Sequence, residues 1–384
     1  MHRLLGPNEA KFWLLDWVAP MNSVIVVQRP GRYPPLDAPR RFAVPVVHAG
    51  VRSRPRWGDA DRPGVLERQE VADDMAWLSE AQRLLRVRVG SAGHPPWHAV
   101  VQHDPGGFTL LLAVNHALTD WRTGLLVASA FLADEHPGPL APPCEEMLPA
   151  GCFAAADADA DALIDAWWSS RATARWEALG LEALTAILPR QGATRFSLWR
   201  LTADETARLQ GRCEAEGVSL NGALAIALRD TMQIGQVAHS VDMNRFIRPP
   251  PPLGPGLAVA HVFTAVTPGP FWDAARDNRA DLFGQIRDGA AGDMLLALPK
   301  LLLGGAPDYQ PAAMTITGAP TVGRTGGTDA DTTMRLVMSS ARGGGSILII
   351  SMFRDCLQLI AGAPADGPEV PLNIVASRLM EACA

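Results

Sequence analysis

The chain has 384 residues, a length that predicts two domains of ordinary size or one large domain. Apolar residues make up 48% of it and charged residues only 19%, which provides for a large core and excludes a disordered protein. The formal net charge of −6 argues against a nucleic-acid-binding protein, which usually carries a basic domain. No apolar run reaches the roughly 18 residues of a membrane span, and the first residues lack the features of a signal peptide, so we expect a cytoplasmic protein.

Helical and β patterns alternate in the first half of the chain. Residues 8–17 predict a helix and residues 22–28 a strand, and a helical face at positions between 66 and 85 predicts another helix, followed by a short strand. Two β-rich runs then flank the turn Pro105-Gly106-Gly107 and predict a hairpin. The second run is apolar at nearly every position, which is typical of a central strand buried on both faces. It ends at His116, and a helix over 122–135 follows.

The second half begins beyond a biased Ala/Asp stretch at 154–165, where we place the connection between a domain at 1–160 and a domain at 161–384. Thr202-Ala203-Asp204-Glu205 is a capping box that opens one helix, and Ser219 caps the next. Further strands are predicted at 194–202, 239–247, 257–267, 313–318, 333–340 and 346–353, and further helices at 271–289 and 371–383. This interleaving predicts an α/β or α+β protein with two sheets.

His116 is the leading catalytic candidate. It closes the buried strand, and Asp120 follows four residues later at the turn into the next helix. A histidine at a strand end can be held by one ring nitrogen while the other faces a cleft, and imidazole accepts protons near neutral pH. Because an H-x-x-x-D spacing is common by chance, a core histidine without a catalytic role is the alternative on this spacing alone.

The string LLLAVNHALTDWRTGLL around His116 resembles the active-site segment of the chloramphenicol-acetyltransferase-like superfamily, which carries an H-H-x-x-x-D-G motif. Members include condensation domains of nonribosomal peptide synthetases, polyketide-associated acyltransferases, wax ester synthases and alcohol acetyltransferases. Other blocks resemble the superfamily in the same order: LGPNEAKFW, GVSLNGALAIALRDTMQ, VDMNRFIRPPPPLGPG, MTITGAP and ISMFRDCLQLIAG. The resemblance implies an α/β fold in which two such subdomains form a V-shaped pseudo-dimer with a tunnel between them.

The resemblance also implies residue roles. His116 would be the general base that deprotonates an acceptor hydroxyl or amine, which then attacks a thioester without an acyl-enzyme. Asp120 would be structural and would pair with an arginine. We predict Arg245 as that arginine, because it shares strand parity with Val241 and Met243, and Arg248 is the alternative.

The chain departs from the superfamily pattern at several positions. Asn115 stands where the first histidine of the motif is expected, and Trp121 stands where the final glycine is expected. We place both in the substrate tunnel, where Trp121 would reshape the acceptor side. Thr317 in MTITG is placed in the tunnel as well, as a candidate oxyanion donor, and an ordinary strand threonine is the alternative. The superfamily's D-F-G-W-G motif has no counterpart, and the corresponding region reads SSARGGGS.

The function that follows is transfer of an acyl group from a CoA or carrier-protein thioester to a hydroxyl or amine of a small-molecule acceptor, a specialised metabolite. The alternatives are a condensation or cyclisation enzyme acting on a carrier-tethered intermediate, or a degenerate subunit that only binds. Acyl-CoA or a phosphopantetheine thioester would be a co-substrate, with no tightly bound cofactor. We expect a monomer without nucleic-acid or membrane partners.

An acyl or peptidyl carrier protein is one candidate partner. An arginine-rich stretch without acids, between residues 38 and 58, could receive an acidic carrier or the CoA phosphates, and a solvated strand pair is the alternative. No metal is expected, because the five cysteines lack zinc-binding spacing. His94, His98 and His103 straddle a turn and are expected on the surface, and His261 is expected to be a hydrogen-bonded core residue.

Overall fold

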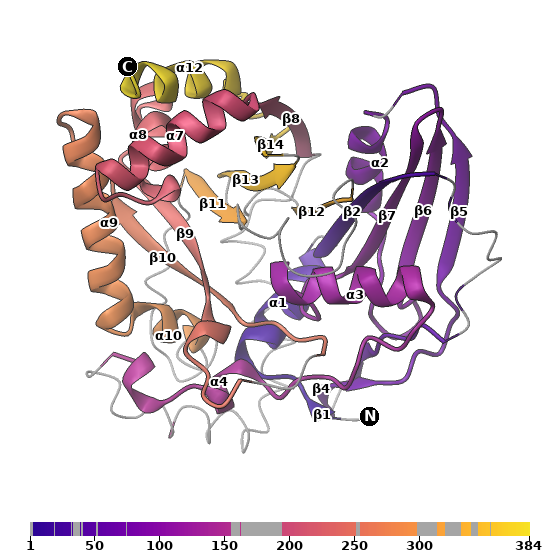
Figure 1. Cartoon of the computed structure of the whole chain (residues 1–384). Coiled ribbons are helices and arrows are strands. Elements are labelled where there is room, and N and C mark those ends of the chain that lie inside the picture. Colours follow the sequence, from indigo (N-terminus) through magenta and orange to yellow (C-terminus); the bar gives the residue numbers. More distant parts are fainter. Residues whose placement is uncertain are drawn as a thin grey trace.

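The computed structural model describes residues 3–18, 20–31, 33, 39, 41–50, 53–73, 75–154, 162, 194–250, 254–297, 313–318, 332–338, 345–353 and 355–384. The Ala/Asp stretch at 154–165 and the SSARGGGS region fall largely outside them. Within the described residues, no helix combines the length and the apolar character that crossing a bilayer requires. Figure 1 shows two lobes, each built on its own large sheet.

The N-terminal lobe contains a five-stranded sheet in the order β12-β2-β7-β6-β5. Its strands are β2 (Asn22–Pro30), β5 (Val65–Glu70), β6 (Trp97–Asp104), β7 (Gly107–Asn115) and β12 (Thr333–Met338). The predicted hairpin is confirmed as the antiparallel pair β6–β7. As its apolar sequence predicts, β7 lies centrally and its residues after Gly107 are buried.

Helices and a small sheet complete this lobe. They are α1 (Pro7–Val18), α2 (Trp77–Leu84), α3 (Trp121–Ala133) and the strands β1 (Arg3–Leu4), β3 (Val46–Gly50) and β4 (Ser53–Gly58). The chain then crosses over, and α4 (Cys144–Met147) and a 3₁₀ turn at Ala150–Cys152 pack against the C-terminal lobe. The single helix expected between residues 66 and 85 is wrong, because Val65–Glu70 pairs parallel to β6 as an edge strand. Pairing with a neighbouring strand overrides a local helical pattern.

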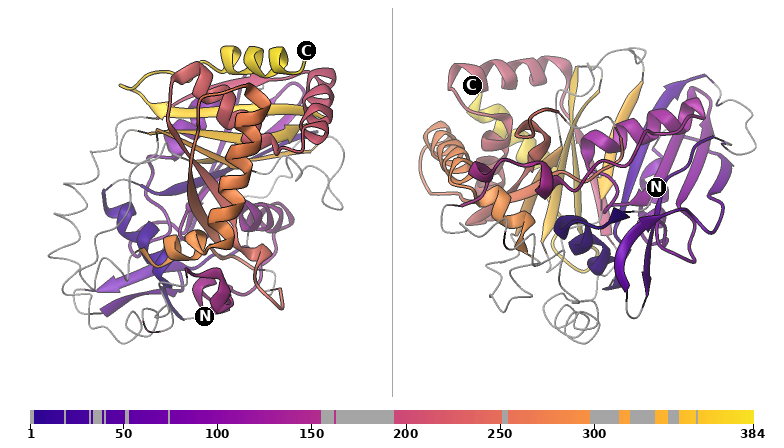
Figure 2. Two further views of the ribbon diagram at one scale, coloured as in Figure 1. Left: turned by 90° about the vertical axis from the view of Figure 1, so that its left-hand side faces the viewer. Right: turned by 90° about the horizontal axis from the view of Figure 1, so that it is seen from below.

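The C-terminal lobe contains a six-stranded sheet in the order β10-β9-β11-β13-β14-β8. Its elements are β8 (Thr194–Arg200), α7 (Ala203–Ala215), α8 (Leu220–Met232), β9 (Gln236–Asp242), a 3₁₀ turn at Met243–Arg245, β10 (Val259–Ala265), α9 (Phe271–Arg287), α10 (Ala290–Leu295), β11 (Met314–Gly318), β13 (Ser346–Phe353), β14 (Cys356–Pro364) and α12 (Leu372–Ala382). The predicted capping box at Thr202 and the Ser219 cap are confirmed. Helices α7, α8, α9 and α12 lie on the side of this sheet away from the N-terminal lobe (Figures 1 and 2).

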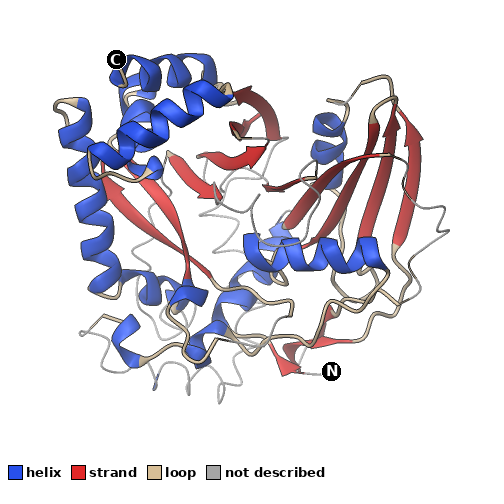
Figure 3. Ribbon diagram, viewed as in Figure 1, coloured by secondary structure: helices blue, strands red, loops and turns tan. Residues whose placement is uncertain are grey.

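The two sheets share one apolar cluster between the lobes. Alternate residues of β2 and β7, such as Val24 and Leu111, pack there with Ile349 of β13 and Ile360 of β14. The opposite face of the N-terminal sheet packs against α1 and α3, so both faces of β2 and β7 are covered. Figure 3 shows the same arrangement, with the sheets facing one another and most helices at the periphery.

Strand β12 crosses between the lobes. It lies in the second half of the chain but pairs antiparallel with β2, so one strand crosses the domain boundary predicted at 160. Its Arg335 side chain is buried between the sheets and donates hydrogen bonds of 2.5 Å to the side-chain oxygens of Gln28 and Gln358. The guanidinium also lies over the Trp77 ring, 5.2 Å from its centroid. This polar contact joins elements of both lobes inside an apolar interface.

Candidate functional site

His116 follows directly after β7 and is buried, with 7% of its surface exposed. Its Nδ1 lies 2.7 Å from the Thr119 carbonyl oxygen and 3.0 Å from Ser23 Oγ. Because a carbonyl only accepts, this hydrogen-bond geometry assigns the hydrogen of the neutral imidazole to Nδ1 and the lone pair to Nε2. The Phe12 ring packs edge-on against the imidazole, with 4.5 Å between ring centroids. The end of β7, the turn after it and α1 therefore hold the imidazole in place. The hydrogen bond to Thr119 selects the tautomer that a base requires.

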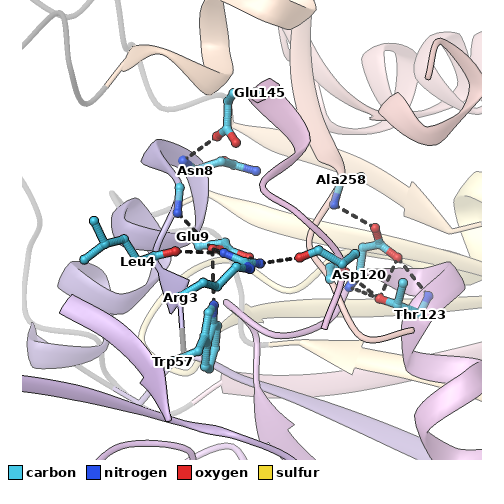
Figure 4. Close-up of polar contacts among 12 residues, drawn as sticks. Arg3, Leu4, Asn8, Glu9, Trp57, Asp120, Thr123, Glu145 and Ala258 are labelled. Atoms are coloured by element: carbon cyan, nitrogen blue, oxygen red, sulfur yellow. Dashed lines mark hydrogen bonds and ion pairs between the residues drawn. The ribbon is translucent and has the colours of Figure 1, made fainter. Parts of the chain in front are cut away.

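Asp120 is the N-cap of α3 and also joins the lobes (Figure 4). Its Oδ1 accepts hydrogen bonds from the backbone N–H and the hydroxyl of Thr123, at 2.9 and 3.1 Å. Its Oδ2 accepts the backbone N–H of Ala258, just before β10, at 2.9 Å. Burial raises the pKa of this carboxyl, and the two backbone donors oppose that rise. The residues between His116 and α3 are thus anchored to the C-terminal lobe through Asp120.

The predicted pairing of Asp120 with Arg245 is wrong. The strand expected over 239–247 ends at Asp242 and turns into a 3₁₀ helix, so the alternation that placed Arg245 beside Val241 is lost. The Arg245 side chain is 76% exposed and lies 3.7 Å from Asp242. Arg248, the alternative, is also exposed and donates to the Ile247 carbonyl. Backbone N–H groups take the place that we assigned to an arginine.

The three residues assigned to the tunnel have different surroundings. Asn115 is buried, and its Oδ1 accepts the backbone N–H of Ala117 at 2.9 Å, so it shapes the turn that carries His116. Trp121 begins α3 and packs against the core of the N-terminal lobe, and its indole N–H has no partner among the described residues. Thr317 is buried on β11, on the sheet face opposite to Ile316 and the helices. Lining of a tunnel by these residues stays a prediction.

A second polar group lies next to His116 and was missed from the sequence. Lys11 of α1 and His261 of β10 both contribute to it, and burial is the main cause of the shift in each pKa. The pKa of Lys11 falls to about 8, with Glu145 opposing the fall. The pKa of His261 falls to about 3, and its electrostatic interactions with Lys11 and His116 add to the effect of burial. Since these residues come from distant segments, no local pattern points to them.

Glu145 of α4 lies at the first turn of α1 and interacts electrostatically with Lys11. Its carboxyl is buried and its Oε1 accepts the backbone N–H of Asn8 at 2.6 Å, while Oε2 has no partner among the described residues. Burial raises its pKa to about 7. Nearby, Glu9 accepts hydrogen bonds from Arg3, Gly6 and Trp57, so α1 is fixed by acids at its start (Figure 4).

The Glu145 carboxyl makes stability depend on pH. An unfolded glutamate ionises near pH 4.5, whereas the folded protein keeps this proton to about pH 7, so the folded state binds more protons between these values. We expect the free energy of unfolding to fall across this window, by up to about 3 kcal/mol. Glu145→Gln should remove that part of the slope in urea unfolding at pH 5 and pH 8. Glu135→Gln, at an exposed position, is the charge-matched control, and an unchanged slope in Glu145→Gln contradicts the prediction.

The remaining candidates do not form a site. Among the described residues, no three His, Cys, Asp or Glu side chains are grouped so that they could hold a metal ion. The surface position expected for His98 is wrong, because it is buried and its Nε2 contacts Glu67. In the arginine-rich stretch, Arg56 is exposed, and Arg41 is exposed with its guanidinium 3.9 Å from Asp134. Arg40 and Arg52 lie outside the described residues.

Comparisons with known proteins identify the fold. No family model matches the chain, and no curated protein matches it. Polyketide synthase associated protein 5 from Mycobacterium tuberculosis superposes with a TM-score of 0.64 at 15% identity, covering 100% of this chain and 98% of the other. The first condensation domain of the CDA synthetase gives 0.65 at 15% identity, covering 100% and 96%.

A third solved structure is the EpoB cyclization-docking bidomain from Sorangium cellulosum, with a TM-score of 0.58 at 14% identity, covering 100% of this chain and 85% of that chain. The chain therefore has the fold of condensation domains, which consists of two chloramphenicol-acetyltransferase-like subdomains. This confirms the fold class expected from the sequence, whereas the tunnel between the subdomains stays a prediction.

Proposed function

We propose that the protein is an acyltransferase that moves an acyl group from a CoA or carrier-protein thioester to a hydroxyl or amine of a small-molecule acceptor. The observation that carries this proposal is the hydrogen bond from His116 Nδ1 to the Thr119 carbonyl. It keeps the lone pair on Nε2 in a buried imidazole, which is the form that can take a proton from an acceptor. The condensation-domain fold supports the same class of chemistry.

The reaction proposed at His116 uses only the acceptor, the thioester and the imidazole. Nε2 accepts the proton of the acceptor as its oxygen or nitrogen attacks the thioester carbonyl carbon. The tetrahedral intermediate collapses, the carbon–sulfur bond breaks, and the proton on Nε2 passes to the departing thiolate. The products are an ester or amide and a free thiol. A donor must stabilise the oxyanion of the intermediate, and Thr317 remains our candidate for it.

Asp120 acts in this proposal as a positioning residue. Its contacts with Thr123 and Ala258 fix the turn that presents His116, and they connect that turn to β10 of the other lobe. A base must be held in reach of the proton that it removes, because small displacements lower the rate strongly. The carboxylate thus contributes to catalysis through the geometry of His116.

A second candidate is condensation or cyclisation of an intermediate tethered to a carrier protein. The similar structures favour it, because they include condensation and cyclization domains. Trp121 at the motif's glycine position also fits an altered acceptor side. A third candidate is a subunit that binds such substrates without turnover.

One experiment separates these candidates. The full chain is incubated with acyl-CoA thioesters and with acylated carrier proteins, each with a mixture of amine and hydroxyl acceptors, and masses of all species are measured. Acylated free acceptor supports the proposal, and product that remains on a carrier without use of CoA supports the second candidate. Binding of substrate without any new product would overturn both enzymatic functions and support the binding subunit.

A further inference from the structure

Helix α1 places the ammonium of Lys11 near His116. Phe12 packs against the His116 imidazole, and the amine of the preceding Lys11 lies over the same Phe12 ring, 5.2 Å from its centroid. Asn8, one helical turn earlier, donates from Nδ2 to the Val259 carbonyl of β10 at 3.1 Å. This bond fixes the face of α1 that carries Asn8, Lys11 and Phe12 against β10.

His261 faces the same space from β10. It lies two residues after Val259, and the charges of both Lys11 and His116 act on it. The side chains of Lys11, His116 and His261 therefore lie close enough to interact electrostatically, although they come from α1, the end of β7 and β10. Burial keeps His261 neutral near pH 7, so Lys11 carries the positive charge near His116.

No acid of the described residues forms an ion pair with the Lys11 ammonium. Glu145 is the carboxyl that acts on it, but the two form no ion pair within the described part of the chain, and Glu145 accepts the Asn8 N–H instead. Lys11 is half-buried, and removing part of the hydration of an ammonium without giving it a partner is costly. An anion that binds beside the ammonium would offset this cost.

We propose that Lys11 binds a carboxylate of the substrate and so selects carboxylate-bearing substrates for reaction at His116. This inference rests on the proposed acyl transfer and names its substrate class. The anion is not the phosphate of the pantetheine arm, because that phosphate lies at the opposite end of the arm from the thioester on which His116 acts. The carboxylate belongs either to the acceptor, as in an amino acid, or to the acyl group, as in a dicarboxylic acid.

Matched substrates test the proposal and distinguish the two sources. Acceptors are L-amino acids and their amides, and donors are butyryl-CoA and succinyl-CoA, compared for the wild type, Lys11→Met and Lys11→Arg. We expect the wild type to favour the carboxylate member of one pair by roughly 10- to 100-fold in kcat/KM. Lys11→Met should abolish that preference through KM while the neutral member changes little, and Lys11→Arg should retain part of it. Arg62→Met, at an exposed position, is the control.

Three outcomes would overturn the proposal. The first is a wild type without preference in either pair, and the second is equal loss of both members in Lys11→Met, which indicates a structural role. The third is a failure to bind a carboxylate.

Binding is measured as the shift in melting temperature that butyrate causes, compared with the shift that butyramide causes. We expect a shift with butyrate alone in the wild type and none in Lys11→Met. If butyrate causes no such shift in the wild type, the carboxylate site is contradicted, even if no turnover is found. Turnover failing while this shift persists would count against the proposed acyl transfer alone.

Discussion

His116→Ala is expected to lower acyl transfer by roughly 100- to 10,000-fold, the usual contribution of a general base. The lone pair on Nε2 has no substitute in alanine, so the acceptor would attack with its proton still in place. The fold should survive, because His116 contacts a carbonyl, a hydroxyl and one aromatic ring rather than supporting a sheet. Thiol release is measured together with circular dichroism of the same preparation.

A matched histidine variant makes this result specific. His136 is exposed beyond the end of α3, and His136→Ala should leave the rate unchanged. A His116→Ala protein that is folded and fully active contradicts the assignment of the base. A protein that is inactive because it is unfolded is recognised by its spectrum, and His116→Gln, which keeps a polar side chain, then replaces it.

Asp120→Ala is expected to destabilise the protein by about 2–4 kcal/mol. It removes an N-cap, typically worth about 1 kcal/mol, and leaves the buried Ala258 N–H without its acceptor, which costs roughly 1–3 kcal/mol. Urea unfolding measures the loss. Asp120→Asn keeps one acceptor oxygen, which cannot accept from both Thr123 and Ala258. The stability of this variant should therefore lie between that of the alanine variant and that of the wild type.

Arg245 supplies the contrast for this prediction. Because its side chain is largely exposed and pairs with Asp242, Arg245→Ala should change stability by less than about 0.5 kcal/mol. An Asp120–Arg245 pair would instead make both alanine variants severely destabilised. Wild-type stability of Asp120→Ala contradicts the role given to the backbone contacts with Thr123 and Ala258.

Local signals in the sequence predicted local structure well. The Pro-Gly-Gly turn, the apolar run of β7 and the capping box at Thr202 each depend on neighbouring residues, and the structure confirms all three. The order of the motif blocks along the chain predicted the fold class through their resemblance to a known superfamily.

Contacts between distant segments could not be predicted from local sequence patterns. Nothing in residues 333–338 indicates that this strand pairs with β2, about 300 residues away, or that Arg335 meets Gln28 between the sheets. The Asp120–Arg245 error has a related cause, because strand parity holds only while the strand continues. The cluster of Lys11, His261 and Glu145 is assembled from three separate elements, so only the folded chain brings it together.

Acceptor-dependent thiol release tests the central claim most directly. The wild type and His116→Ala are each mixed with an acyl thioester, with and without the acceptor that the wild type acylates in the mass-spectrometric experiment, and thiol, product and intact protein mass are followed together. We predict that the wild type releases one thiol for each acylated acceptor, only when acceptor is present and without an acyl-enzyme, and that His116→Ala loses this reaction. Equal rates in both proteins, or an acylated protein that accumulates without acceptor, would contradict direct transfer with His116 as the base.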